Sequence, residues 1–184
     1  MGQILTPEQW LAECSQRIRA YEGLRLYKYR DANSVATIGY GYAIQGGAVE
    51  SDFAAVGINY ATVMAAPTAI DSEPRNAVAA CIDQDQAFAL FDHVMPRYLN
   101  LATHSVTNWP TVDQVRQFCV LSMAYQTDWL SYIQTRQMIS TGQYYNAAVH
   151  METLPWFSQS GERGVQIVQM LKFGSWEPPL ESVV

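Results

Sequence analysis

The sequence predicts an α+β fold that is mainly helical. Apolar residues recur at helical spacing after Pro7, and again through most of the chain from Ile82 onward. Between these segments, residues 24–44 are rich in β-branched and aromatic residues and contain a cluster of turn residues, which is typical of a small β-hairpin. We therefore expect a β-hairpin near the N-terminus, followed by an all-helical C-terminal half.

The composition is that of one folded domain. Of the 184 residues, 49% are apolar and 15% charged, so a sizeable core is expected and wholesale disorder is not. The net charge of −6 argues against nucleic acid as a partner, because such partners need clustered Lys and Arg. No apolar run is long enough to suggest a membrane span, and the first residues lack the pattern of a secretory signal.

The first helix is expected from about Pro7 to Tyr21 or Glu22. Thr6 can cap its start, Pro7 suits the first helical position, and Gln9 completes a capping box. Gly23 is a natural stop for this helix. Its apolar face consists of Trp10, Leu11, Cys14, Ile18 and Tyr21.

Two strands are expected next, over residues 24–30 and 35–44. They are joined by Asp31-Ala32-Asn33-Ser34, a run of residues that favours turns. Gly39 and Gly41 in the second strand predict a bend or a bulge rather than a flat ribbon. Residues 43–81 show the least regular pattern, and short helices can lie within them.

From Ile82 the pattern is helical almost to the C-terminus. Asp83 can cap a long helix, which Pro96 is expected either to kink or to replace with a new helix. Thr111-Val112-Asp113-Gln114 is interpreted as a second capping box that opens a strongly apolar helix. Further helices are expected at about residues 130–140, 143–151 and 161–173.

Cysteine and histidine usage indicates no metal centre. Cys14, Cys81 and Cys119 are far apart and form no Cys-x-x-Cys motif, so we expect reduced residues of the core. The three histidines do not combine with them at the spacing of metal ligands. The sequence therefore predicts no structural metal and implies no cofactor.

Three polar residues form the candidate catalytic set. Glu22 lies at the expected end of the first helix, where unsatisfied carbonyls disfavour a carboxylate and so favour a protonated acid. Asp31 opens the expected turn, and Thr37 lies in the expected second strand. Each residue also has an ordinary structural interpretation, as a solvated helix end, a turn aspartate and a strand threonine. Together they can protonate a leaving oxygen on one side of a bond and hold a water on the other.

In this set and its spacing the chain resembles the phage-type lysozymes of the T-even phage kind, glycoside hydrolase family 24. That family has Glu-Gly at the end of its first helix, then an Asp, then a Thr in Thr-Ile-Gly-x-Gly. The corresponding residues here are Glu22-Gly23, Asp31 and Thr37-Ile38-Gly39-Tyr40-Gly41. The resemblance extends to residues 82–91 and 115–126, and to Trp156, Arg163 and the Phe173-Gly174-Ser175-Trp176 ending.

The resemblance implies a two-lobed lysozyme-like fold within one domain that covers residues 1–184. An N-terminal lobe with the β-hairpin would cover residues 1–82, and an inter-lobe helix residues 83–103. A helical C-terminal lobe would cover residues 104–184. Residues 43–81 are longer than the usual connection of the family, and we interpret them as a surface insertion. A lid, a carbohydrate contact and a contact with a larger assembly are the alternatives.

The resemblance also implies a role for each candidate. Glu22 would be the general acid that protonates the leaving sugar oxygen, while Asp31 and Thr37 would hold the attacking water. Such an inverting reaction needs about 6.5–9.5 Å between its two carboxyl groups.

Other positions match residues that bind substrate or orient the acid. Arg163 matches the residue that pairs with the catalytic Glu, and Tyr125 and Gln126 match residues that line the cleft. The sequence departs from the family at Tyr42, where His is frequent, and at the facing position, Val94. The His–Asp ion pair of the family is therefore expected to be absent, without effect on catalysis.

The implied activity is that of a muramidase, which hydrolyses the β-1,4 bond between N-acetylmuramic acid and N-acetylglucosamine in peptidoglycan during phage-driven lysis. The expected partners are glycan strands, with neither nucleic acid nor membrane insertion, and the expected state is a monomer. We expect synthesis in the host cytoplasm and action on the cell wall in the periplasm, after release by a holin or delivery by the virion.

Two other functions are open. A lytic transglycosylase uses the acid but forms an internal anhydro product, so it would not need Asp31 and Thr37 to hold water. A non-catalytic peptidoglycan-binding phage structural protein could keep the fold, although both acids are present here.

Overall fold

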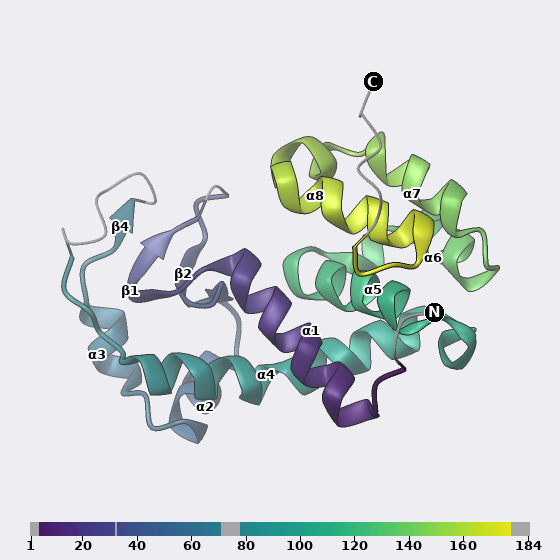
Figure 1. Cartoon of the computed structure of the whole chain (residues 1–184). Coiled ribbons are helices and arrows are strands. Elements are labelled where there is room, and N and C mark those ends of the chain that lie inside the picture. The colour runs from purple at the N-terminus through teal and green to yellow at the C-terminus, as the bar shows by residue number, and fades with distance from the viewer. Residues whose placement is uncertain (1–3, 32, 71–77, 178–184) are drawn as a thin grey trace. The chain divides into compact units, whose positions relative to one another are not determined.

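The computed structural model describes residues 4–31, 33–70 and 78–177 and confirms a mainly helical α+β fold (Figure 1). The chain divides into a sheet unit, Ser15–Pro96, and a helical unit, Met1–Cys14 with Arg97–Val184. The elements in chain order are α1 (Pro7–Glu22), β1 (Arg25–Arg30), β2 (Ala36–Gly39), β3 (Tyr42–Ala43), α2 (Val49–Ala55), α3 (Tyr60–Ala65), β4 (Ala69–Ile70), α4 (Gln84–Ser105), η1 (Trp109–Thr111), α5 (Gln114–Gln126), η2 (Trp129–Ser131), α6 (Ile133–Ser140), α7 (Tyr144–Glu152) and α8 (Pro155–Phe173).

Helix α1 begins and ends as the sequence predicts. At its start the Gln9 N–H donates to Thr6 Oγ1 over 3.3 Å, and the Thr6 N–H donates to Gln9 Oε1 over 3.0 Å. This reciprocal pair confirms the capping box. At its end the Gly23 N–H donates to the Arg19 carbonyl over 3.0 Å, and Gly23 leaves the helix at φ +66°. Glu22 is therefore the last helical residue.

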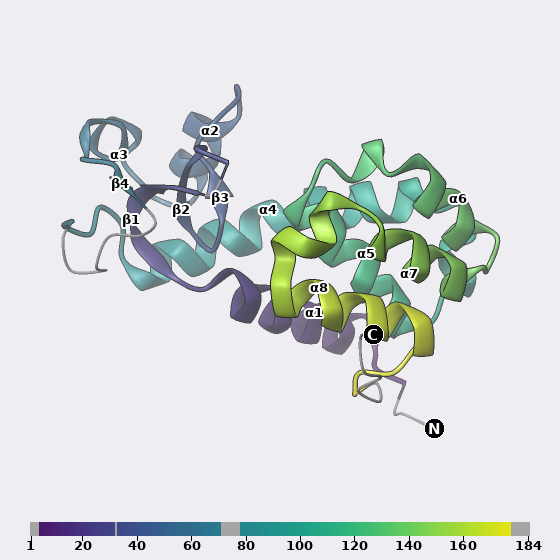
Figure 2. The same cartoon turned by 90° about the horizontal axis from the view of Figure 1, so that it is seen from above.

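The sheet has four strands in the order β3-β2-β1-β4 (Figure 2). Strands β1 and β2 form the predicted hairpin, with Tyr29 opposite Thr37. The predicted bend is a complete reversal, because β3 folds back on β2 and pairs Tyr42 with Ile38. Strand β4 adds a parallel edge, with Ala69 opposite Tyr29. The hairpin prediction was thus incomplete, since a two-residue strand is too short to show an alternating pattern.

Residues 43–70 contribute a strand and core side chains to the sheet unit, so their interpretation as a surface insertion is wrong for this described part. Lys28 on β1 is buried, and its Nζ donates to the Met64 carbonyl over 2.8 Å, near the end of α3. The segment also supplies apolar side chains to the core, namely Val49, Phe53, Ile58, Val63 and Ala69.

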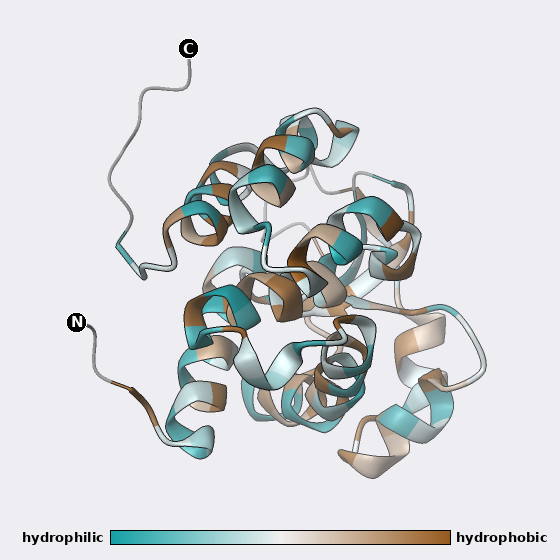
Figure 3. Ribbon diagram, turned by 90° about the vertical axis from the view of Figure 1, so that its right-hand side faces the viewer, coloured by the Kyte–Doolittle hydropathy of each residue, from teal (hydrophilic) through white to brown (hydrophobic). Residues whose placement is uncertain are grey.

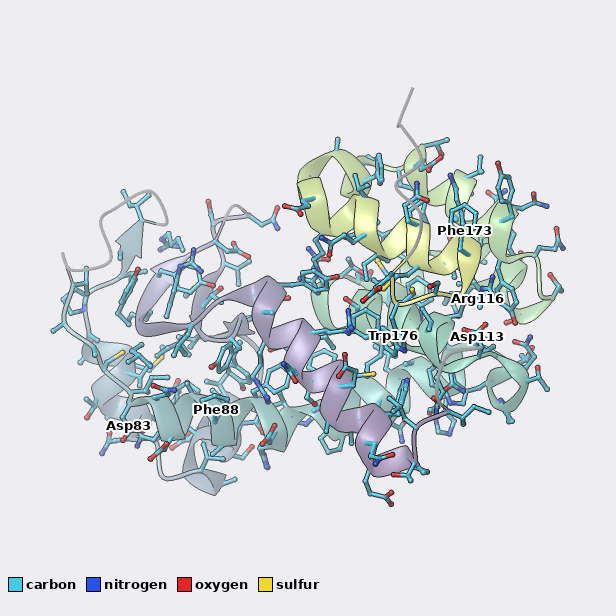
Figure 4. All side chains as sticks on the ribbon, viewed as in Figure 1. Asp83, Phe88, Asp113, Arg116, Phe173 and Trp176 are labelled. Carbon is cyan, nitrogen blue, oxygen red and sulfur yellow. The ribbon has the colours of Figure 1, made fainter. Side chains whose placement is uncertain are left out.

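Helix α4 starts at the predicted cap. Asp83 Oδ1 accepts from the Gln86 N–H over 2.7 Å, and Gln86 Oε1 accepts from the Asp83 N–H over 3.0 Å. Figure 4 shows Asp83 at the start of the helix and Phe88 farther along it. The helix continues through Pro96, so the alternative of a new helix there was wrong.

Replacing the cap tests its contribution to stability. We expect Asp83→Ala to lower the free energy of unfolding by about 1 kcal/mol, because it leaves the Gln86 N–H without its side-chain acceptor. Urea unfolding followed by circular dichroism measures this loss. Asp85→Ala, which removes a charge from the same turn but no cap, should cost about half as much or less. Equal losses in the two variants would contradict the capping role.

Helix α5 begins differently from the prediction. Its cap is Asp113, whose side chain accepts from the N–H three residues later over 3.0 Å. Thr111 belongs to η1, so the predicted box from Thr111 to Gln114 does not form. The Gln114 amide instead donates to the Leu5 carbonyl over 2.8 Å and accepts from the Leu5 N–H over 3.0 Å. A contact remote in sequence has replaced the local one.

Helix α8 contains a break. Gly161 has φ 53° and ψ −131°, a conformation that only glycine adopts readily, and it separates a first segment from the predicted helix. That first segment, from Pro155, was missed because it is only a turn or two long. Helices α6 and α7 agree with their predicted positions to within three residues.

In Figure 3 hydrophobic (brown) and hydrophilic (teal) residues alternate along the helix ribbons of the molecule. In the helical unit the apolar residues supply the core. The largest fully buried ones are Phe118, Leu121, Met123, Trp129, Ile139, Met151 and Ile167.

The end of α8 is fixed to α5. Arg116 Nε donates to the Leu171 carbonyl and its Nη2 to the Lys172 carbonyl, each over 2.8 Å. The Trp176 ring then packs on Phe118 with 5.2 Å between centroids. These contacts satisfy carbonyls of the last helical turn and close the helical unit.

The cysteines are free thiols, as predicted. Cys14 and Cys119 are buried and Cys81 is half-buried. Burial raises the pKa of the Cys81 and Cys119 thiols, which keeps both protonated at neutral pH.

Among the described residues, no helix combines the length and the apolar character that a membrane crossing requires.

Candidate active site

All three predicted catalytic residues lie in the sheet unit. Glu22, the last residue of α1, is half-buried, and its carboxylate lies against the turn between β2 and β3. A Cβ built on Gly41 in that turn would stand 2.6 Å from Glu22 Oε2. Gly41 also has φ +78°, which side chains disfavour. Two features therefore favour glycine at position 41. One is its positive φ, and the other is the close approach of the Glu22 carboxylate.

Asp31 is held in a fixed orientation by the turn it opens. Its Oδ1 accepts from the backbone N–H groups of Asn33, over 2.9 Å, and Val35, over 2.8 Å. Its own N–H donates to the Val35 carbonyl over 3.0 Å. Oδ1 therefore has the ordinary structural role of a turn aspartate, because it binds the backbone of its own turn. Among the described residues these hydrogen bonds do not involve Oδ2.

Thr37 lies in β2 and is only 3% exposed. Its Oγ1 donates to the Val35 carbonyl over 3.1 Å. Because this bond uses the only hydroxyl proton, the same oxygen can act toward a further group only as an acceptor. Both Asp31 and Thr37 are therefore oriented through Val35.

Arg19 fixes the end of α1 and was not singled out by the sequence. It precedes Glu22 by three residues, and its guanidinium lies 4.9 Å from the Phe88 ring centroid and 5.2 Å from that of Phe91 on α4. Its Nη1 is also 3.4 Å from Asp92 Oδ1. Such cation–π contacts contribute about 0.5–2 kcal/mol each. In the sequence Arg19 is one of several basic residues, and their spacing does not indicate its contacts with α4.

The buried carboxylate of Asp52 lies beside the turn between β2 and β3. Tyr42 Oη donates to Asp52 Oδ2 over 2.8 Å, and His93 Nε2 lies 3.2 Å from Asp52 Oδ1. Val94, the position expected to face Tyr42, is a buried apolar residue. The His–Asp pair of the resembled family was not expected at these two positions, but a different His–Asp pair is present, between His93 and Asp52. The sequence analysis missed it because Asp52 lies in the irregular segment.

Arg163 lies in the helical unit, on α8 just after the break at Gly161. It is 8% exposed, and its Nη2 donates to Ser122 Oγ on α5 over 3.1 Å. A buried guanidinium needs several hydrogen-bond acceptors, and this hydroxyl provides one of them. The role of Arg163 as the partner of Glu22 stays a prediction.

Tyr125 and Gln126 lie at the end of α5 in the same unit. The Tyr125 ring packs on Tyr98 with 4.7 Å between centroids. Gln126 Oε1 accepts from Trp156 Nε1 over 3.1 Å, which connects α5 to the first segment of α8. Their contact with sugar stays a prediction.

The helical unit also contains a mainly apolar cavity of about 420 Å³. It is lined by the first turns of α1, by α4, by η1 and by α5, and the rings of Trp10 and Trp109 meet there edge to face at 6.4 Å. None of the predicted site residues lines it. The cavity is therefore not part of the candidate catalytic set in the sheet unit.

No family model matches the sequence, and no curated protein matches it either.

Proposed function

We propose that the protein is a muramidase of the phage-type lysozyme kind. It would hydrolyse the β-1,4 bond between N-acetylmuramic acid and N-acetylglucosamine in peptidoglycan, with inversion, during lysis of a bacterial host. The observation that carries the proposal is the close approach of the Glu22 carboxylate to Gly41, in the same unit as Asp31 and Thr37. A free helix-end glutamate would not require a neighbouring glycine of this kind.

In the proposed reaction Glu22 donates its proton to the oxygen that leaves with one sugar. A water attacks the anomeric carbon from the opposite face of the ring. Among the described residues the hydrogen bonds of the turn occupy Asp31 Oδ1, so we assign the water to Oδ2. The proton that the water releases then passes to Asp31.

Thr37 would complete the orientation of this water. Because its proton is used by the Val35 carbonyl, its oxygen accepts a second hydrogen bond from the water. One hydrogen of the water would then point at Asp31 and the other at Thr37. A lone pair of the water oxygen is left to attack the anomeric carbon. This division of roles supports hydrolysis over transfer to an internal hydroxyl.

Digestion of purified peptidoglycan tests the function and separates it from its alternatives. We expect soluble fragments with reducing N-acetylmuramic acid ends, first formed as the α anomer in proton NMR. Anhydro ends would indicate a lytic transglycosylase, and a β anomer would contradict the role of Asp31. Sedimentation of the protein with intact peptidoglycan, without release of fragments, would indicate a binding protein.

A further inference from the structure

Asp52 stands out as a charged side chain that the proposed reaction does not use. It is 1% exposed on α2, and burial of a carboxylate is costly unless hydrogen bonds compensate for it. Here both oxygens have partners, Tyr42 Oη at 2.8 Å and His93 Nε2 at 3.2 Å. Asp52 thus joins three elements, namely β3, α2 and α4.

The contact with Tyr42 bears on the candidate active site. Tyr42 directly follows Gly41, the residue against which the Glu22 carboxylate lies. Its ring packs on Phe53, with 5.6 Å between centroids, and its hydroxyl bonds Asp52, so α2 holds both the body and the tip of this side chain. Since glycine has little conformational preference of its own, the position of the turn depends on such anchors.

The other side of the site, the end of α1, is fixed to α4, which also contacts Asp52. Arg19, one turn before Glu22, packs on Phe88 and Phe91 of α4, and His93 of α4 bonds Asp52. Helix α4 thereby sets the separation between the end of α1 and the turn at Gly41. Reacting groups need such support, because a displacement of about 1 Å can cost about 100-fold in rate.

We propose that Asp52 is a positioning residue for the general acid. Through the Tyr42 hydroxyl it fixes the turn at Gly41, and this turn fixes the carboxylate of Glu22. The inference rests on the proposed function, because it requires Glu22 to be the acid.

The test measures kcat and KM separately on soluble glycan-strand fragments of peptidoglycan, at a temperature where circular dichroism shows every variant to be folded. We expect Tyr42→Phe, which keeps the ring on Phe53, to lower kcat about tenfold and to leave KM within about twofold. Asp52→Leu should act in the same way. Asp52→Asn, whose amide oxygen still accepts from Tyr42, should retain kcat within about twofold.

Two controls separate positioning from stability. Tyr60→Phe removes a hydroxyl from another ring that packs on Phe53, at 6.4 Å, and should leave kcat unchanged. Glu152→Gln breaks the ion pair with Lys172 in the helical unit, which should lower the melting temperature but not kcat.

If Tyr42→Phe keeps the wild-type kcat, and the wild type is active while Glu22→Gln is not, the inference is overturned and the proposed function stands. A wild-type protein without glycosidase activity overturns both. Should Asp52→Leu fail to fold, Tyr42→Phe alone decides the outcome.

Discussion

Replacing Glu22 with Gln is expected to reduce the hydrolysis of peptidoglycan at least 1,000-fold, the upper part of the range of about 10²–10⁴ for loss of a general acid. The amide cannot donate a proton that the leaving oxygen can keep. Gln has the size and shape of Glu, so the approach to Gly41 is preserved and the fold should not change. The clearing of permeabilised Gram-negative cells, followed as loss of turbidity, measures the effect.

A matched control lies on the same helix. Glu8→Gln changes the net charge by the same amount in the first turn of α1, where the carboxylate accepts a hydrogen bond from Thr6 Oγ1. This variant should clear cells at the wild-type rate. If Glu22→Gln retained a tenth of the wild-type activity, Glu22 would not be the general acid.

Replacing Gly41 with Ala is expected to reduce kcat about 100-fold, because a displaced carboxylate no longer meets the leaving oxygen. The added Cβ would stand 2.6 Å from Glu22 Oε2 and 3.2 Å from its Cδ, distances that force the acid to move. The backbone at φ +78° adds a loss of stability of about 1–2 kcal/mol. Steady-state kinetics and urea unfolding measure the two effects separately.

Gly57 provides the control for Gly41. It lies in the same unit with φ +70°, but a Cβ there would meet no atom within 4 Å. Gly57→Ala should therefore show a comparable loss of stability and a wild-type kcat. If both variants lost activity equally, backbone strain rather than displacement of Glu22 would be the cause.

The features that the sequence predicts correctly depend on neighbouring residues. The caps at Thr6 and Asp83 form because donor and acceptor lie within a single turn, so spacing alone defines them. The end of α1 at Glu22 follows in the same way from the glycine after it. The orientation of two candidate residues is local as well, although the sequence did not predict it, since Asp31 and Thr37 both bond Val35.

The features that it misses depend on residues far apart in the chain. Gln114 has the right spacing for a local cap but bonds Leu5 instead, because a second partner became available in the folded chain. The structural role of Asp52 depends on its contacts with Tyr42 and His93, which no sequence spacing connects to it. Strand β4 likewise exists only because β1 offers a free edge to pair with.

Attempts to engineer a smaller version of this protein would start from residues 43–70, which look in the sequence like a dispensable loop. Deletion there would remove the strand that covers the edge of β1, the carbonyl that accepts a hydrogen bond from Lys28, and the aspartate that holds Tyr42. A bare strand edge is a site for aggregation. Substitutions on the exposed faces of α2 and α3 would leave these contacts in place, whereas shortening the segment would break them.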